Sequence, residues 1–326
     1  MKLQGIQLVT AAALLGCAGA PCAQPAFPSK PLRMIVAFPA GGPTDLQARL
    51  IARKLTDAFG QPVVVDNRGG AGGVIGAELA AKAPPDGHTL FFASISVVMA
   101  PLLMQKPPVD AVRDFAPIGM VSTNPYVMLV HPSLPVKTVR DFVALAKTRP
   151  GQMNYLNYSS SGTGTPPHLG VELMKLAAGI SITHIPHKGA GPALTDLLAG
   201  HVAMVWMNPL TALPQHRSGK ARALAVTTLR RSPAAPEIPT LAEGGVSGVD
   251  VGSWFAMLAP TGTAKDITAR LHSEITRAVS APDSRARLDA DGSEPFSMPP
   301  EETAAFLRNE VVKWQKVVKA INLRTE

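Results

Sequence analysis

The stretch Leu32–Asp45, LRMIVAFPAGGPTD, decides the fold, because an apolar run meets a Gly/Pro turn and then the start of a helix. Leu32–Phe38 predicts a buried strand, since continuous apolar runs are typical of strands covered on both faces. Apolar residues then recur at helical spacing at positions 46, 50, 51, 55 and 59, which predicts an amphipathic helix. Strands that alternate with helices in this way indicate a parallel sheet.

The same alternation continues along the rest of the chain. The first round has strand patterns at 63–65, 90–93, 118–122 and 126–130, with helical patterns at 77–83 and 139–147. The second has strand patterns at 155–157, 182–185, 202–206 and 221–227, with helical patterns at 169–177 and 192–198. Pro150-Gly151 separates the two rounds, and amphipathic helices at 267–279 and 307–318 close the chain. We therefore expect two α/β lobes around a cleft, with the last helices packed back on the first lobe.

Composition narrows the class of protein. The 326 residues suggest about two domains. Only 17% of the residues are charged and 46% are apolar, which disfavours long disorder. The net charge of +8 comes from dispersed cations, which favours anionic small ligands over nucleic acid. The two cysteines, Cys17 and Cys22, exclude a disulfide scaffold and a metal site built from several thiolates.

Residues 1–26 are typical of a secretory signal peptide, with Lys2, an apolar run and then small residues. The apolar run at 9–15 is too short to span a bilayer, and we expect a soluble mature protein. Three cleavage sites stay open. They are after Ala20, after Ala23, or before Cys17, where LLGC resembles a lipoprotein box and would make Cys17 a lipid anchor.

Three loops between a strand and a helix are rich in Gly, Ser and Thr. They span 38–45, 67–73 and 159–165. Glycine lets backbone N–H groups face a cleft, and a helix N-terminus adds a positive dipole end. Each loop alone is also explained by ordinary turn chemistry. Two such loops at equivalent helices of two lobes predict an anion site between them.

Motifs for catalysis, metals and cofactors are missing. Gly70–Gly76 is one residue off the dinucleotide fingerprint, and no acid lies about 20 residues beyond Gly70. The chain has no G-x-S-x-G elbow and no H-E-x-x-H. Ser159–Ser161 have no base beside them in sequence, and His168 is expected to cap or pack a helix. We expect no metal, no cofactor and no catalytic residues.

Several segments in order resemble the tripartite tricarboxylate transporter receptor family, also called the Bug family. They are FPAGGPTD at 38–45, DNRGGAGG at 66–73, DGHTL at 86–90, SSGTGT at 160–165 with His168-Leu169, the stretch from Lys188-Gly189 to Gly200, and the W-x-x-x-L-A-P stretch at 254–260. The second segment is usually E-N-R-P-G-A-G-G in the family. The resemblance covers nearly the whole mature chain.

The resemblance implies a periplasmic solute-binding receptor with a type II, Venus flytrap fold and two crossing hinge strands. The crossings are expected near Pro125–Val130 and Val226–Arg231. The lobes are then 27–126 with 230–326, and 127–229. Such a protein is a monomer and not an enzyme. It captures a small carboxylate ligand between its lobes and delivers it to membrane subunits of a tripartite tricarboxylate transporter.

The resemblance also implies the ligand contacts, through loops that grip a carboxylate from opposite lobes. Carried onto this chain, the ligand-binding residues are Ala40, Gly41, Gly42, Thr44, Asp45, Ser94, Ser96, Ser160, Ser161, Gly162, Gly164, Thr165 and Met207. Two other roles stay open for the same shape. One is a ligand-sensing receptor for a signalling system, and the other is a secreted hydrolase using Ser160 or Ser161.

Two residues depart from the family pattern. Met207 stands where relatives often carry Asp, and His187 stands where Tyr usually precedes Lys-Gly. Without that acid, an α-amino acid would bury its ammonium unpaired. The sequence therefore predicts a carboxylate with an apolar or aromatic body, unless Met207 lies outside the pocket and packs in the core.

Overall fold

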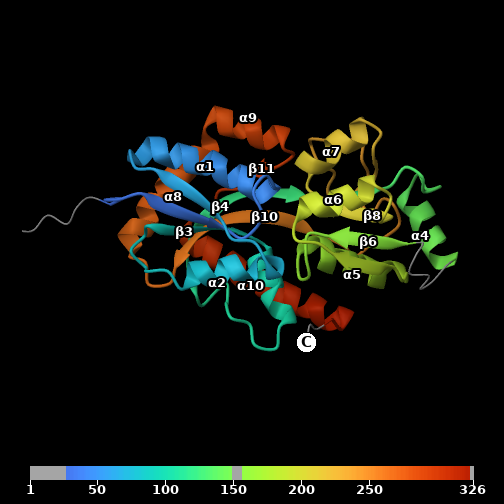
Figure 1. Cartoon of the computed structure of the whole chain (residues 1–326), viewed down its shortest axis with the longest axis horizontal. Helices are drawn as coiled ribbons and strands as arrows, with labels where there is room; N and C mark the ends of the chain where they lie inside the picture. Colours follow the sequence, from blue (N-terminus) through green and yellow to red (C-terminus); the bar gives the residue numbers. More distant parts are fainter. Residues whose placement is uncertain (1–26, 149–155, 324–326) are drawn as a thin grey trace, which may run out of the picture.

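The computed structural model describes residues 27–148 and 156–323, and shows two α/β lobes side by side (Figure 1). The predicted signal peptide with Cys17 and Cys22 lies outside the described residues. So do the predicted break at Pro150-Gly151 and the first residue, Tyr155, of one predicted strand.

The first lobe is built on a six-stranded sheet with the order β11-β4-β10-β3-β1-β2. Its strands are β1 (Leu32–Val36), β2 (Val63–Asn67), β3 (Thr89–Ser94), β4 (Phe115–Pro125), β10 (Gly252–Pro260) and β11 (Glu294–Pro295). Its helices are α1 (Pro43–Phe59), η1 (Ala71–Gly73), α2 (Val74–Ala81), α3 (Ser96–Met99), η2 (Pro101–Leu103), α8 (Lys265–Ser280), α9 (Pro282–Ala290) and α10 (Pro300–Ile321).

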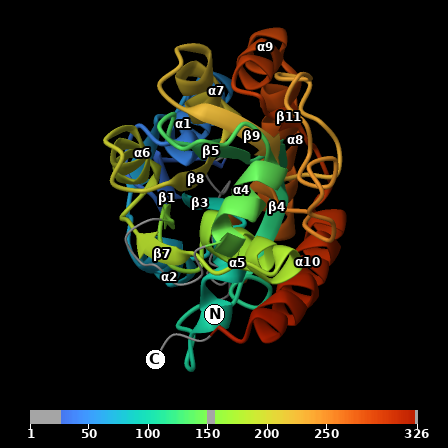
Figure 2. The same cartoon turned by 90° about the vertical axis from the view of Figure 1, so that its right-hand side faces the viewer.

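Both faces of this sheet are buried, which explains the continuous apolar run of β1. Met34 and Val36 pack in one apolar cluster with Leu271 and Ile275 of α8. Ile35, which points to the opposite face, packs in a second cluster with Trp314 of α10. Figures 1 and 2 show α10 running beside the first lobe toward the second, where it contacts α5 (Pro166–Ala178).

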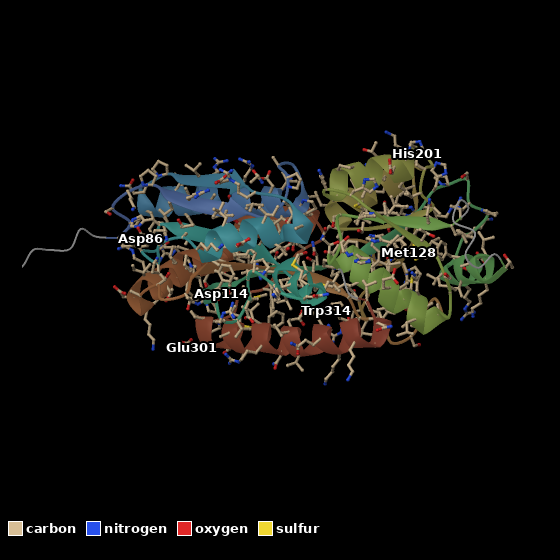
Figure 3. All side chains as sticks on the ribbon, turned by 60° about the horizontal axis from the view of Figure 1, so that its bottom comes forward. Asp86, Asp114, Met128, His201, Glu301 and Trp314 are labelled. Atoms are coloured by element: carbon tan, nitrogen blue, oxygen red, sulfur yellow. The ribbon has the colours of Figure 1, made fainter. Side chains whose placement is uncertain are left out.

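The second lobe is built on a five-stranded sheet with the order β7-β6-β8-β5-β9. Its strands are β5 (Val127–Val130), β6 (Asn157–Ser160), β7 (Thr183–Pro186), β8 (Met204–Met207) and β9 (Arg222–Val226). Besides α5, its helices are α4 (Val139–Thr148), α6 (Ala190–Leu198) and α7 (Pro209–Arg217). Polar side chains stand on the outer faces of both lobes, as His201 and Asp86 do at opposite ends (Figure 3).

The sheets are mixed, so the expectation of parallel sheets is only partly right. β1 pairs in parallel with β2 and β3, but β10 runs antiparallel to β3 and β4. Likewise β5 runs antiparallel to β8 and β9. β5 and β10 are the strands that enter a lobe from the hinge. They therefore run against the strands whose carboxyl ends point toward it.

Thr227 joins the segments that cross between the lobes. The chain passes from β4 to β5 through Tyr126, whose N–H donates to Thr227 Oγ1 at 3.0 Å, while Thr227 N–H donates to Tyr126 O at 3.0 Å. Val251 N–H donates to Thr227 O at 3.0 Å just before β10 begins. Residues 228–250 thus leave and return at one point. We propose lobe boundaries at Tyr126 and at this junction, since Ala235 still packs in the apolar cluster of the second lobe.

The lobes touch where glycines leave room for the opposite backbone. A Cβ on Gly72 would overlap the carbonyl oxygen of Thr163, and a Cβ on Gly164 would lie 2.7 Å from Ala100 Cα. Both glycines have positive φ, +65° and +78°. These contacts allow the two lobes to approach closely on one side of the cleft.

Replacing Gly72 by Ala should hold the lobes apart, because the new methyl group would collide with a backbone atom of the other lobe. Gly60→Ala is the matched control, since Gly60 has the same φ of +65° and nothing within 4 Å of its Cβ position. Both variants carry similar backbone strain. Small-angle scattering should give a larger radius of gyration for Gly72→Ala alone, and equal radii for the two variants would contradict the contact.

Candidate functional site

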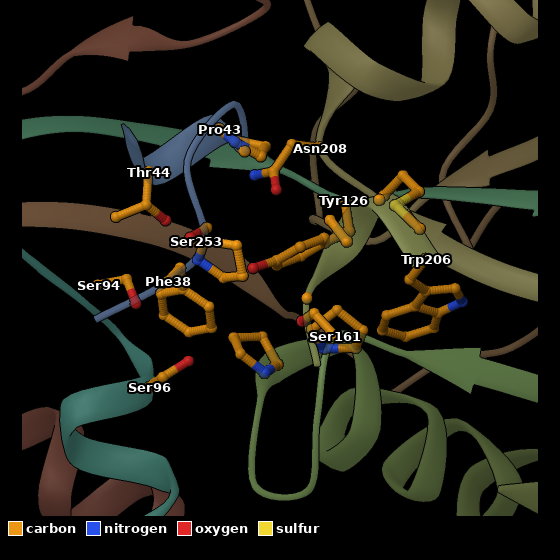
Figure 4. A pocket seen from close by; sticks show the side chains of 18 of the residues that line it. Phe38, Pro43, Thr44, Ser94, Ser96, Tyr126, Ser161, Trp206, Asn208 and Ser253 are labelled. Atoms are coloured by element: carbon orange, nitrogen blue, oxygen red, sulfur yellow. The ribbon is translucent and has the colours of Figure 1, made fainter. Parts of the chain in front are cut away.

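A cavity of about 220 Å³ lies between the lobes, at the carboxyl ends of the strands (Figure 4). Ligands of open α/β sheets bind at this edge. From the first lobe it is lined by Phe38, Pro39, Ala40, Gly41, Gly42, Pro43, Thr44, Ser94, Ser96, Ser253 and Phe255. Tyr126 at the hinge and the second lobe complete it, with Ser161, Pro166, Pro167, Gly189, Ala190, Gly191, Pro192, Trp206, Met207 and Asn208.

Four helices of nine or more residues begin at the wall of this cavity. They are α1, α5, α6 and α7, whose first residues or N-cap residues line it. Each helix N-terminus carries unpaired N–H donors and a partial positive charge. No Asp, Glu, Lys, Arg or His is among the lining residues. The cavity is therefore electropositive through backbone dipoles and contains no ionised side chain.

Hydroxyl groups provide further donors inside the cavity. The side chains of Thr44, Ser94, Ser96 and Ser161 line it, and none of the four hydroxyls has a hydrogen-bond partner in the part of the chain that the structure describes. These groups come from both lobes. A small anion held between them would receive neutral hydrogen bonds from two sides.

Aromatic rings and Met207 form the rest of the wall. Phe38, Tyr126 and Trp206 surround the cavity in Figure 4. Burial raises the pKa of the Tyr126 phenol far above its usual value, although a hydrogen bond with Ser253 opposes the shift. The phenol is therefore neutral at every physiological pH. The wall offers apolar area to the body of a ligand.

Most of the predicted contacts line this cavity, namely Ala40, Gly41, Gly42, Thr44, Ser94, Ser96, Ser161 and Met207. Met207 is 2% exposed and also packs in the apolar core of the second lobe. It therefore lies at the boundary between the cavity wall and the core. Gly41 has φ of +79°, whereas Gly42 has an ordinary φ of −79°. A need for glycine through positive φ applies to Gly41 alone.

Asp45 does not line the cavity. Its buried carboxylate accepts hydrogen bonds from Gly41 N–H at 2.9 Å, Arg49 Nε at 2.9 Å and Asn67 Nδ2 at 3.0 Å. Burial raises the pKa of this carboxyl, but the three hydrogen bonds outweigh burial and lower the pKa below its usual value. Asp45 thus holds the Gly41–Gly42 turn in place, and its charge is paired with Arg49, which does not line the cavity.

Ser160, Gly164 and Thr165 belong to the loop at 159–165 but do not line the cavity. Ser160 is fully buried, with its Oγ 2.7 Å from His184 Nε2. Thr165 Oγ1 donates to Gly162 O at 2.6 Å, and Gly164 packs on Ala100. Gly162 lines a second, wider cavity of about 890 Å³ that shares Phe38, Pro39 and Ser161 with the first.

Several lining residues were not predicted. The start of α6 at 189–192 carries the same Gly/Pro signature as the predicted loops, so the sequence contained a usable signal. Ser253 belongs to β10, a strand that was not predicted. Tyr126 and Asn208 follow strands directly, and their local sequence does not indicate which way their side chains point.

The fold and the cavity define a two-lobed solute-binding protein of the periplasmic type. The family model of the tripartite tricarboxylate transporter family receptor matches residues 47–323, and the chain belongs to this family.

Three relatives illustrate the similarity. Protein BugT of Bordetella pertussis is 39% identical over 302 residues, which are 92% of each chain. A structure from R. palustris with adipate is 34% identical with a TM-score of 0.87, over 91% of this chain and 99% of that one. MatC of Rhodopseudomonas palustris, with bound malate, is 32% identical with a TM-score of 0.83, over 90% and all of the respective chains.

Within 27–148 and 156–323, no helix is long and apolar enough to cross a bilayer. The same ranges contain no cluster of three or more His, Cys, Asp or Glu side chains suited to a metal ion.

Gly41→Val should weaken ligand binding by more than ~1 kcal/mol, because a β-branched residue at φ +79° would move the turn at the cavity wall. Gly179→Val is the matched control, since Gly179 ends α5 at φ +63° with nothing within 4 Å of its Cβ position. Calorimetric titration with a carboxylate that the unaltered protein binds measures the difference in affinity between the two variants. Unchanged affinity in a folded Gly41→Val protein would remove this turn from the site.

Proposed function

We propose that this protein is an extracytoplasmic receptor that captures a small carboxylate between its lobes and delivers it to a tripartite tricarboxylate-type transporter. One observation carries the proposal. Among the described residues, the N-termini of four of the longer helices meet at a cavity that has no charged side chain and has four unpaired hydroxyls. A carboxylate is the common small anion whose two oxygens match such a set of neutral donors.

The electrostatic preference for an anion comes from the backbone. A helix N-terminus stabilises a nearby negative charge by about 0.3–1 kcal/mol when exposed, and by up to ~2 kcal/mol when partly buried. Several helix N-termini act on one cavity here, and the charge of Asp45 is paired with Arg49, which does not line that cavity. The adipate and malate named for two structures of the family are both carboxylates.

The walls favour a ligand with an apolar or aromatic body. Phe38, Trp206 and Met207 contribute apolar surface, and no acid is present among the lining residues to pair with an ammonium. Burying an unpaired ammonium costs several kcal/mol. α-Amino acids are therefore poor ligands in this proposal.

Location and partners follow from the family. Residues 1–26 would direct export to the periplasm, with Cys17 as a lipid anchor in one alternative, and the receptor would act as a monomer on membrane transporter subunits. A sensing role would use the same cavity. A hydrolase role is disfavoured because Ser160, the serine beside His184, is fully buried and does not line the cavity.

Calorimetric titration should rank ligands by the chemistry of the cavity. An aromatic carboxylate and a simple dicarboxylate should bind more tightly than aspartate or glutamate, because only the amino acids bring an ammonium. Absence of any turnover product during the titration is the expected companion result.

Two outcomes of the titration would contradict these expectations. Tight binding of aspartate or glutamate, with none of the other compounds bound, would overturn the proposed ligand class. Failure of every carboxylate to bind would overturn the proposed function itself.

A further inference from the structure

Three stacked rings lie behind the loop that follows β6. The His168 and His184 rings have centroids 3.9 Å apart and planes 12° apart, and Tyr158 stacks on His184 at 4.9 Å. His168 is 3% exposed and Tyr158 is fully buried. None of the three lines the cavity, so none contacts a ligand there.

Each histidine holds one end of this loop through a ring nitrogen. His184 Nε2 lies 2.7 Å from Ser160 Oγ, which also accepts a hydrogen bond from Gly162 N–H at 3.2 Å. Four residues further on, Gly164 N–H donates to His168 Nδ1 at 3.1 Å. The loop is therefore fixed on both sides of Ser161, whose side chain faces the cavity (Figure 4).

We propose that His168 and His184, as a stacked pair of neutral imidazoles, are positioning residues for ligand binding, because they fix the loop that presents Ser161 to the cavity. The proposal rests on the proposed function of that cavity. It adds a requirement that the pair remain uncharged.

The hydrogen bonds explain why charge would disrupt the loop. His168 Nδ1 accepts a hydrogen bond from the Gly164 N–H, so this nitrogen carries no hydrogen of its own. If His168 were protonated, its Nδ1 would carry a hydrogen that points at the Gly164 N–H. The two donors would then repel each other. Two stacked imidazolium ions would also repel each other at this separation.

The charged groups around the pair compensate only in part for a positive charge, because Glu172 raises the pKa of His168 while Lys175 lowers it. Glu172 already accepts from Tyr158 Oη at 2.6 Å and pairs with Lys175 Nζ at 2.8 Å. His187 Nε2 lies 3.0 Å from a carboxylate oxygen of Asp196. Burial is the main reason that the pKa falls to about 4 for His168 and about 3 for His184, with Lys175 lowering both.

Loop position also affects the contact between the lobes. Gly164, which donates to His168, is the glycine that packs on Ala100 of the first lobe. A shift of this loop would therefore change both the direction of Ser161 and the fit of the closed lobes.

Two substitutions at His168 separate positioning from packing. His168→Asn keeps an acceptor oxygen near the place of Nδ1 and cannot be protonated, whereas His168→Leu keeps bulk but leaves the Gly164 amide unpaired. At pH 7 we expect His168→Leu to lose about tenfold or more in affinity for the tightest carboxylate of the titration series, and His168→Asn to stay within about threefold. His131→Leu, outside the cavity, is the control and should bind like the unaltered protein.

A pH profile provides the second readout. Affinity in the unaltered protein should be level from pH 8 to about 5 and fall as the pH passes about 4, where His168 becomes protonated. Protonation of the ligand affects His168→Asn equally, so the difference between the two profiles isolates the histidine. Stability should also decline below pH 6.5, because the unfolded chain takes up protons that the folded pair resists, and circular dichroism defines the usable range.

Nitrogen-15 spectroscopy of the free protein tests the geometry without any ligand. His168 Nδ1 should give the signal of an unprotonated nitrogen at pH 7, and the Gly164 amide should shift in His168→Leu but little in His168→Asn. Equal affinities for His168→Leu and the unaltered protein, equal losses in both variants, or a protonated Nδ1 at pH 7 would each overturn the proposal. If no carboxylate binds the unaltered protein, the proposed function fails while the spectroscopic test still decides the state of the pair.

Discussion

The direction of the strands is the constraint on which the site depends. In each lobe, the strands that precede a cavity-lining loop or helix point their carboxyl ends at the same cleft. A helix that follows such a strand must begin there, so its positive end faces the cleft. In the proposed function, the preference for anions thus comes largely from chain direction, and the side chains around the cavity can stay neutral.

Neutral walls require that nearby charges be satisfied elsewhere. Asp45 lies in the first turn of α1, next to the cavity, yet its carboxylate is held by Gly41, Arg49 and Asn67. In the second lobe, Glu172 is held by Tyr158 and Lys175 behind the loop. Both lobes therefore use ionised groups to shape a loop from behind and present only backbone and hydroxyl groups in front. On binding, a ligand would exchange the water molecules around it for backbone N–H and hydroxyl dipoles that the fold already holds in place.

The sequence predicted the parts of the fold that have a local signature. Leu32–Asp45 and 155–165 both combine a strand, a glycine-rich turn and a helix start, and the two-lobed fold follows from their repetition. β10 was not predicted, although Gly252 and Pro260 bound its apolar run as Gly and Pro bound the other strands, so the sequence contained a usable signal there too. At the site, the sequence located the loops but not the direction of each side chain. Ser161 faces the cavity while Ser160 is buried, as alternation along an extended chain requires, but which of the two faces inward depends on the register of β6. Tyr126 and Asn208 line the cavity because of where the crossings meet, which is a property of the tertiary fold.

The junction at Thr227 also has a mechanical meaning. Because Thr227 is hydrogen-bonded to both Tyr126 and Val251, both connections between the lobes pass through one small region. Rotation of one lobe about this fulcrum displaces atoms in proportion to their distance from it. Tyr126 is part of both the fulcrum and the cavity wall, so the back of the cavity moves least. The contacts at Gly72 and Gly164 are made by other loops, away from the fulcrum, and a small rotation would part them first. The lobes would therefore open by rotation about the Thr227 junction, and the part of the cavity next to Tyr126 would keep its shape.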